Sequence, residues 1–221
     1  MGAGPPRPPA PRARDMPAPR RNQSAAGSFM QRMFAWPYRA ILAGLYRLGV
    51  RPWQLTLASL ITNIAAGVLL VRGDRLLPGL LLIPAGAFDV FDGSIARLRG
   101  EAGRAGAFLD SALDRVSDMI LFGCLFWSLA RQGMELEAAL ALATLIVALM
   151  VSHVRAEAEA AGASLSEGLF QRLERYLALM AGLLIPGALL PVLVVLTVLG
   201  SATMIQRLYS GWRRLRPGGF A

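Results

Sequence analysis

The chain has 221 residues, of which 55% are hydrophobic, and it carries a formal net charge of +9 without a single lysine. The apolar residues gather in blocks of about 20, the length that a helix needs to cross a hydrocarbon core of roughly 30 Å. This composition predicts an all-α integral membrane protein. No RNA- or DNA-binding motif accompanies the positive charge, so nucleic acid is excluded as a partner. The lipid bilayer and phosphate-bearing substrates are the expected partners.

The first residues of the chain differ from the rest in composition. Residues 1–28 are rich in Pro, Arg, Ala and Gly and lack a continuous apolar run. We therefore expect a disordered cytoplasmic tail and not a signal peptide. In residues 29–50, apolar side chains alternate with arginines, which predicts an amphipathic interfacial helix, bent near Pro37, along the bilayer surface. A soluble docking helix is the alternative interpretation.

Six transmembrane helices are predicted within residues 51–210, and a basic cytoplasmic tail is predicted for 211–221. The spans are expected near 54–72, 77–97, 105–130, 136–157, 169–187 and 190–209. The three turns on one side of these spans hold three arginines between them, whereas the other side receives the remaining arginines and both tails. Because positively charged segments stay in the cytoplasm, both termini are expected there.

Four aspartates lie where a lipid-buried helix would carry Leu or Val: Asp89, Asp92, Asp110 and Asp114. One ionised side chain at the bilayer centre costs about 2.5–3.5 kcal/mol, so four would cost roughly 10 kcal/mol. That is comparable to the stability of a whole domain, about 5–15 kcal/mol. An oxygen-only set of carboxylates favours Mg²⁺ or Mn²⁺, and four carboxylates can hold two ions. A salt-bridge cluster with Arg97 and Arg115 is the alternative, but two arginines cannot balance four aspartates.

Helical spacing places these aspartates on two polar stripes. Asp89 and Asp92 lie one turn apart on one predicted span, and Asp110 and Asp114 do so on the next. The cytoplasmic loop between the spans is short, so the helices are expected to be antiparallel neighbours with facing stripes. Small residues along the stripes allow close helix approach or leave room for a ligand: Gly93, Ala96 and Gly106.

The same residues form a motif. It reads Asp89-xx-Asp92-Gly93-xx-Ala96-Arg97, then eight residues, then Gly106-xxx-Asp110-xxx-Asp114. The motif matches the signature of the CDP-alcohol phosphotransferase family at every fixed position, and the likeness extends over about residues 30 to 210. The resemblance implies six transmembrane helices around a cytoplasm-facing polar cavity, and a homodimer.

The resemblance also implies roles for individual residues. The four aspartates would bind two divalent ions, and Asp114 would act as the general base. The nucleotide of the CDP-lipid would contact Trp53, Gln54, Leu55, Thr56, Gly93, Arg97 and Gly103. The acceptor hydroxyl would attack the phosphorus that bears the lipid, and CMP would leave.

A second polar set lies at the cytoplasmic ends of the last three predicted spans: Ser152, Arg155, Arg172, Arg175 and Arg207. One interpretation is that these are ordinary arginines at the cytoplasmic membrane face and form no site. For Arg172 this interpretation and a binding role are equally favoured. The other interpretation is a pocket for the phosphate of the acceptor. The surrounding segments resemble actinobacterial phosphatidylinositol phosphate synthases, which implies that Ser152, Arg155, Arg175 and Arg207 hold inositol phosphate. His153, the only histidine, is expected to be a packing residue.

The leading hypothesis is a multi-pass enzyme of the cell (inner) membrane, with its active site on the cytoplasmic side. It would transfer a phosphatidyl group from CDP-diacylglycerol to a phosphorylated polyol, inositol phosphate, giving phosphatidylinositol phosphate and CMP. Glycerol 3-phosphate, giving phosphatidylglycerol phosphate, is the alternative, because it also carries a phosphate. A divalent-cation transporter is a remote alternative, since nothing polar in the spans reaches the opposite side.

Overall fold

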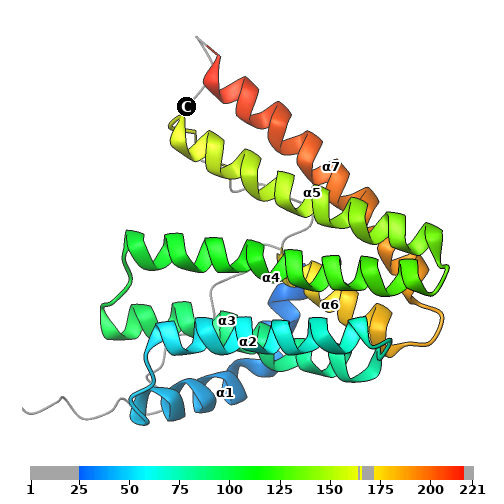
Figure 1. Ribbon diagram of the computed structural model, residues 1–221. Coiled ribbons are helices and arrows are strands. Elements are labelled where there is room, and N and C mark those ends of the chain that lie inside the picture. The colour runs from blue at the N-terminus through cyan, green and yellow to red at the C-terminus, as the bar shows by residue number, and fades with distance from the viewer. Residues whose placement is uncertain (1–24, 164, 166–171, 217–221) are drawn as a thin grey trace, which may run out of the picture. The chain divides into compact units, whose positions relative to one another are not determined.

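The computed structural model describes residues 25–163, 165 and 172–216, and in this part of the chain every regular element is an α-helix (Figure 1). The helices are α1 (Ala25–Arg47), α2 (Pro52–Val71), α3 (Leu76–Arg99), α4 (Arg104–Arg131), α5 (Glu135–Ala160), α6 (Arg172–Leu184) and α7 (Leu189–Leu215). The all-α prediction is thus confirmed for the described residues. Two boundaries differ from those predicted: α1 begins within the tail assigned to 1–28, and α7 continues into the tail assigned to 211–221.

Four of the described helices are long and apolar enough to cross a membrane: α2, α3, α5 and α7. Helix α4 is long enough, but the segment up to its middle carries Asp110, Asp114, Arg115 and Asp118. Helix α6 has only 13 described residues, and the predicted span 169–187 begins outside the described part of the chain. Length and composition therefore support four spans. Helix α4 is too charged, and the described part of α6 is too short, to be counted as a span on these grounds alone.

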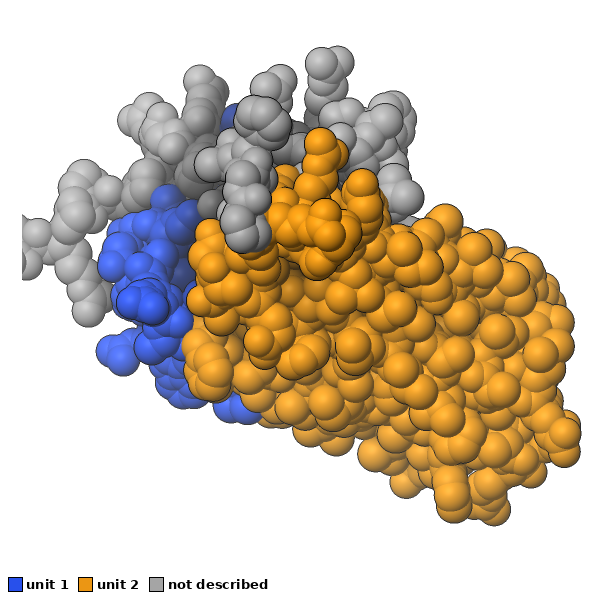
Figure 2. Space-filling view, turned by 90° about the horizontal axis from the view of Figure 1, so that it is seen from above, with its two compact units in different colours: residues 1–57, 88–107 blue, residues 58–87, 108–221 orange. Residues whose placement is uncertain are grey.

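The chain divides into two compact units (Figure 2). Unit 1 comprises residues 1–57 and 88–107, and unit 2 comprises residues 58–87 and 108–221. Helix α1 belongs to unit 1, and α5, α6 and α7 belong to unit 2. Helices α2, α3 and α4 contribute residues to both units, so the predicted aspartate motif is shared between them.

In unit 1, α1 packs against the second half of α3 through aromatic and polar contacts. The rings of Tyr38 and Phe91 stack with centroids 5.1 Å apart, and the Tyr38 hydroxyl lies 2.6 Å from Ser94 Oγ. Near the end of α1, Arg99 lies over the ring of Tyr46, with its Cζ 5.2 Å from the centroid. Leu42 and Ala43 of α1 are buried, whereas Trp36, Ile41 and Leu48 are exposed. The described second half of α1 therefore packs on α3 through some of its apolar residues and exposes others, and its predicted place at the bilayer interface stays a prediction.

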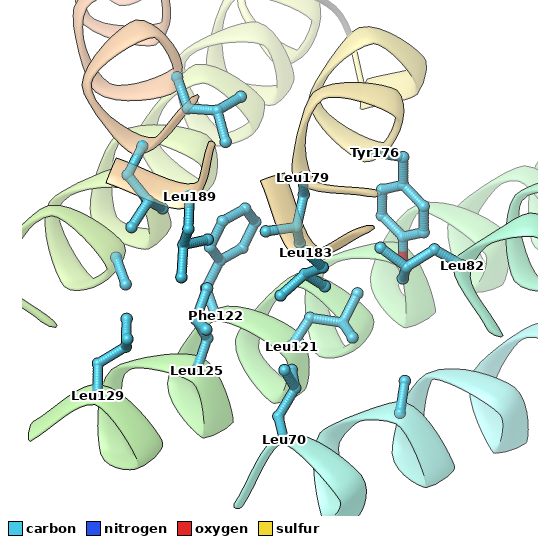
Figure 3. Packing of buried hydrophobic residues seen from close by; sticks show 14 of the residues in the cluster. Leu70, Leu82, Leu121, Phe122, Leu125, Leu129, Tyr176, Leu179, Leu183 and Leu189 are labelled. Atoms are coloured by element: carbon cyan, nitrogen blue, oxygen red, sulfur yellow. The ribbon is translucent and has the colours of Figure 1, made fainter. Parts of the chain in front are cut away.

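The hydrophobic core of unit 2 gathers leucines from several helices (Figure 3). Leu121, Phe122, Leu125 and Leu129 recur along α4 at the spacing of one helix face, and all four are almost completely buried. Helix α6 adds the side chains that pack against them: Tyr176, Leu179 and Leu183. This core fixes the rotation of α4 and α6 about their axes, which decides where their polar residues lie.

Helices α5 and α7 run side by side (Figure 1) and are held together by small and hydroxyl residues. The hydroxyls of Thr144 and Thr197 lie 2.9 Å apart. A Cβ at Gly200 would come within 2.8 Å of Val147 Cγ1, so the close approach of the two helices requires glycine there. Such contacts are typical of helices that pack within a bilayer, where lipid tails remove the hydrophobic advantage of helix association.

Candidate active site

The predicted nucleotide-binding segment forms the first turn of α2 in unit 1. Pro52 takes the first helical position, where a missing N–H does no harm, and the backbone N–H of Arg51 donates to Gln54 Oε1 at 2.8 Å. This is half of a capping box, which fixes where the helix begins. Trp53 and Gln54 are exposed and Leu55 is buried. The buried side chain of Leu55 thus anchors the segment, and the exposed side chains of Trp53 and Gln54 are accessible to a ligand.

Asp92 on α3 is directly supported by the same turn of α2. Its carboxylate is 5% exposed, and Thr56 Oγ1 donates to its Oδ2 at 2.8 Å. A hydrogen bond to a carboxylate fixes its orientation, as the neighbours of metal-binding carboxylates commonly do. Asp89, one turn earlier on α3, is half-buried. Thr56, which the sequence assigns to nucleotide contact, therefore also positions a predicted metal ligand.

Arg97 lies one turn beyond Asp92 and Gly93 on the same helix. Its Nη2 donates to Ser94 Oγ at 3.0 Å, and Ser94 also contacts the hydroxyl of Tyr38 from α1. A Cβ at Gly93 would lie 3.4 Å from Arg97 Nη1, which is ordinary van der Waals contact. The side chain of Arg97 is exposed, as is Gly103 in the loop after α3. Ser94 thus orients the guanidinium of Arg97, which remains accessible to a phosphate.

The turn that follows Arg97 is set by Gly100, whose φ of 67° lies in the left-handed region that favours glycine. The N–H of Gly100 donates to the carbonyl of Arg97 at 3.2 Å, and the N–H of Glu101 donates to that of Ala96 at 2.9 Å. This pair of bonds is a Schellman motif, which ends α3. Helix α4 begins at Arg104, so the sequence itself enforces the short connection between the two aspartate-bearing helices.

In unit 2, Asp114 forms an ion pair with Arg172 of α6. Arg172 Nη1 lies 2.6 Å from Asp114 Oδ1, and the two side chains are 20% and 28% exposed. The guanidinium also lies over the ring of Tyr176, 5.0 Å from its centroid. Arg172 therefore has a specific acidic partner and is not merely one of the arginines expected at the predicted cytoplasmic membrane face. Asp110, one turn before Asp114, is half-buried.

One charged residue of this region was not singled out from the sequence as a site residue. Asp118 lies one turn after Asp114 on α4, and its Oδ2 accepts a hydrogen bond from Arg175 Nη2 at 2.8 Å. The two side chains are only 4% and 7% exposed. The signal was available, because Asp118 continues the four-residue spacing of Asp110 and Asp114.

Among the residues predicted to bind the acceptor, Arg175 and Arg207 are buried within unit 2. Arg207 Nη1 donates to the carbonyl of Val151 at 3.0 Å. Arg155 of α5, Arg175 of α6 and Arg207 of α7 thus all belong to unit 2.

The remaining predicted residues of this set contact their own helix. Ser152 Oγ donates to the carbonyl one turn earlier on α5, and Arg155 Nε forms an exposed ion pair with Glu159 at 2.8 Å. His153 is exposed and lies 4.0 Å from Glu157, so the prediction of a packing role for it is wrong. The residue falls on the outer face of α5, which its apolar neighbours in the sequence did not reveal.

In unit 1, carboxylate oxygens of Asp89 and Asp92 lie within 4.8 Å of each other and could contribute to a metal site. In unit 2, the predicted ligands Asp110 and Asp114 lie one turn apart on α4. Carboxylate oxygens are hard donors and suit Mg²⁺ or Mn²⁺ better than softer transition metals. The donor set therefore fits the divalent ion that the motif implies.

A family model described as CDP-alcohol phosphatidyltransferase matches residues 50–206. The chain belongs to this family. The prediction of the family from the aspartate motif is thereby confirmed. Two named relatives are phosphatidylinositol phosphate synthase of Mycobacterium marinum, 35% identical with 81% of each chain covered, and archaetidylinositol phosphate synthase of Pyrococcus horikoshii, 34% identical. For the second, 82% of this chain and 94% of the relative are covered.

Solved structures of phosphatidylinositol phosphate synthase from Mycobacterium tuberculosis are similar to the fold of this chain. The structure with CDP-DAG bound has a TM-score of 0.72 at 30% identity, covering 82% of this chain and 96% of that chain. The structure in complex with manganese and citrate has a TM-score of 0.70 at 29% identity, covering 82% and 91%. The chain is therefore an enzyme of this family, and the family chemistry depends on a divalent metal.

Proposed function

We propose that the protein transfers a phosphatidyl group from CDP-diacylglycerol to inositol phosphate, giving phosphatidylinositol phosphate and CMP. The observation that carries this proposal is the arrangement within unit 2. Asp114 lies on α4, and two buried arginines, Arg175 and Arg207, lie in the same unit. A base together with buried cations suits an acceptor that carries both a hydroxyl and a phosphate. The two named relatives support the choice of acceptor, because inositol phosphate is the part that their names share.

Divalent ions, two of Mg²⁺ or Mn²⁺, are proposed to bind the four aspartates. The hard oxygen donors, the close carboxylates of Asp89 and Asp92, and the manganese complex of the M. tuberculosis synthase support this assignment. When bound, the ions would neutralise the pyrophosphate and stabilise CMP as it departs.

The residues of the chain then have distinct tasks. Asp114 accepts the proton of the acceptor hydroxyl as that oxygen bonds to the phosphorus bearing the lipid, while the bond from this phosphorus to CMP breaks. Arg97 holds phosphate oxygens with its planar guanidinium. The first turn of α2, from Trp53 to Thr56, contacts the nucleotide together with Gly93 and Gly103. Arg175 and Arg207, with Ser152 and Arg155, hold the phosphate of the acceptor.

The membrane arrangement is part of the proposal. All six helices from α2 to α7 are proposed to cross the bilayer, with α1 at the cytoplasmic interface and both termini in the cytoplasm of a cell whose inner membrane holds the protein. The exposed apolar side chains along α2 and α7 support contact with lipid: Ile61, Ile64, Val68, Val194, Val198 and Ile205. A homodimer is proposed from the family resemblance alone. Cysteine accessibility from either side of sealed vesicles tests the topology.

A direct assay tests the reaction. Purified protein with CDP-diacylglycerol and a divalent ion should release CMP when inositol phosphate is added, and chelation of the metal should stop the release. We expect Asp114→Asn to lower turnover by about 10²–10⁴-fold, the usual contribution of a general base, while the protein stays folded. Release of CMP with glycerol 3-phosphate but not with inositol phosphate would overturn the assignment of the acceptor. Near-normal turnover by Asp114→Asn would refute the assignment of the base.

The P. horikoshii relative favours one further comparison, since the lipid part of its name differs while inositol phosphate is retained. CDP-archaeol and CDP-diacylglycerol should be compared as donors at a fixed concentration of inositol phosphate. A higher kcat/KM with CDP-archaeol would change the lipid in the proposal and leave the reaction as it stands.

A further inference from the structure

The ion pair between Asp118 and Arg175 is unusual because both side chains are more than nine-tenths buried. Arg175 is separated from Asp118 by 57 residues in sequence, and α6 brings it to the same level of α4. Burying two charges is unfavourable unless their geometry and remaining hydrogen bonds compensate for the loss of water. Replacing a buried ion pair by well-packed apolar side chains is often neutral or stabilising, so packing alone does not explain this pair.

One hydrogen bond joins Arg175 and Asp118, and each side chain has a further buried polar atom that takes no part in it. Arg175 Nε and Asp118 Oδ1 are buried and have no hydrogen-bond partner among the residues that the structure describes. A buried donor without an acceptor is unfavourable, and native structures rarely keep one without reason. A guanidinium has five N–H donors in a rigid plane, so a second anion can bind Arg175 while Asp118 remains bound.

A second buried cation lies in the same unit as this pair. Arg207 of α7 is 7% exposed, and its Nη1 donates to the carbonyl of Val151 on α5 at 3.0 Å. Buried cations are stabilised by an anion that binds them. The surroundings of Arg175 therefore suit a phosphate. Asp118 accepts from Nη2 of Arg175, so the other N–H groups of the guanidinium remain for that phosphate.

We propose that Asp118 is a positioning residue that holds Arg175 in place for the phosphate of the acceptor. This inference rests on the proposed function. Asp114 and Asp118 lie one turn apart, so a guanidinium fixed to Asp118 stands at a set distance along α4 from the base, about 6 Å for four residues. Asp118 thus relates the site that binds the acceptor phosphate to the residue that takes the proton from the acceptor hydroxyl.

The test is a double-mutant cycle on the full-length protein in detergent. For Asp118→Asn we expect the KM for inositol phosphate to rise about tenfold, because one charge-assisted hydrogen bond no longer orients Arg175. The KM for CDP-diacylglycerol should not change. Arg175→Gln should raise the KM for inositol phosphate further, and the double variant should be no worse than Arg175→Gln alone. Glu135→Gln is the control, since it removes an exposed carboxylate from the first turn of α5, at the opposite end of that helix from Ser152 and Arg155, and it should leave all constants near those of the unaltered protein.

An unchanged or lower KM for inositol phosphate in Asp118→Asn would overturn the proposal, because Asp118 would then compete for Arg175 instead of positioning it. Independent, multiplying effects in the double variant would overturn it as well. If Asp118→Asn does not fold, Asp118→Glu keeps the charge but moves it by one methylene, and it should raise the same KM severalfold; an unchanged value overturns the proposal. Failure of the unaltered protein to use inositol phosphate at all would refute the proposed function instead.

Discussion

Replacement of Thr56 by valine tests whether the first turn of α2 supports a metal ligand. Valine keeps the branched shape of threonine and removes the hydroxyl that donates to Asp92 Oδ2 at 2.8 Å. A hydrogen bond to a charged group contributes about 1.5–3 kcal/mol. Loss of a bond that supports a metal ligand typically weakens metal affinity about 10–100-fold, which corresponds to about 1.4–2.8 kcal/mol. The two estimates agree, so we expect the divalent-ion concentration for half-maximal activity to rise about 10–100-fold.

The assay is CMP release during titration with Mg²⁺ or Mn²⁺, with CDP-diacylglycerol and inositol phosphate held at saturation. Thr56→Ser is the matched control, because it keeps the hydroxyl and should retain the metal dependence of the unaltered protein. Thr56 also belongs to the predicted nucleotide-binding segment, so the KM for CDP-diacylglycerol is measured at saturating metal. A raised KM for the nucleotide donor with unchanged metal dependence would refute the reasoning, since Thr56 would then act on the substrate alone.

Two further predictions concern stability, measured as thermal unfolding in detergent. A Cβ at Gly79 would lie 2.8 Å from Leu184 Cδ2, so Gly79→Ala should lower the free energy of unfolding by about 1–3 kcal/mol, whereas Gly123→Ala, which meets no described atom within 4 Å, should be neutral or stabilising. Equal melting temperatures for the two variants would contradict the packing described. Tyr176→Phe removes the 2.8 Å hydrogen bond to the buried Oδ1 of Asn63 and should also lower the free energy of unfolding by about 1–3 kcal/mol. No loss of stability would mean that the amide finds another donor.

The turns that contain glycine show which features of the fold can be predicted from local sequence. Gly100 adopts a positive φ and ends α3, as Gly49, Gly73 and Gly133 do for the helices before them. Helix ends depend on a few neighbouring residues, so the order and approximate bounds of the elements could be predicted. The apolarity of single helices is also local, and it supports four spans where the overall pattern predicts six.

The partners of two arginines could not be predicted from local sequence. Arg172 and Arg175 lie one turn apart in sequence. The resemblance assigns Arg175 to the acceptor phosphate, whereas Arg172 is explained equally well as a charge at the predicted cytoplasmic membrane face. In the structure, Arg172 pairs with Asp114 and Arg175 with Asp118, two contacts between α4 and α6 that differ in burial. Partners this far apart in the chain depend on how each helix is rotated about its axis. That rotation follows from the packing of the leucine core and not from the spacing of the charges.

The sequence by itself determined the helical class and the family, and it predicted that the four aspartates bind metal. Each of these depends on composition or on spacing within one or two turns of helix. Only the tertiary structure decided that Thr56 supports Asp92, that Arg172 meets Asp114, and that Asp118 and Arg175 form a buried pair. Such contacts join segments far apart in the chain, and their geometry is set by side-chain packing over the whole core, which no local pattern encodes.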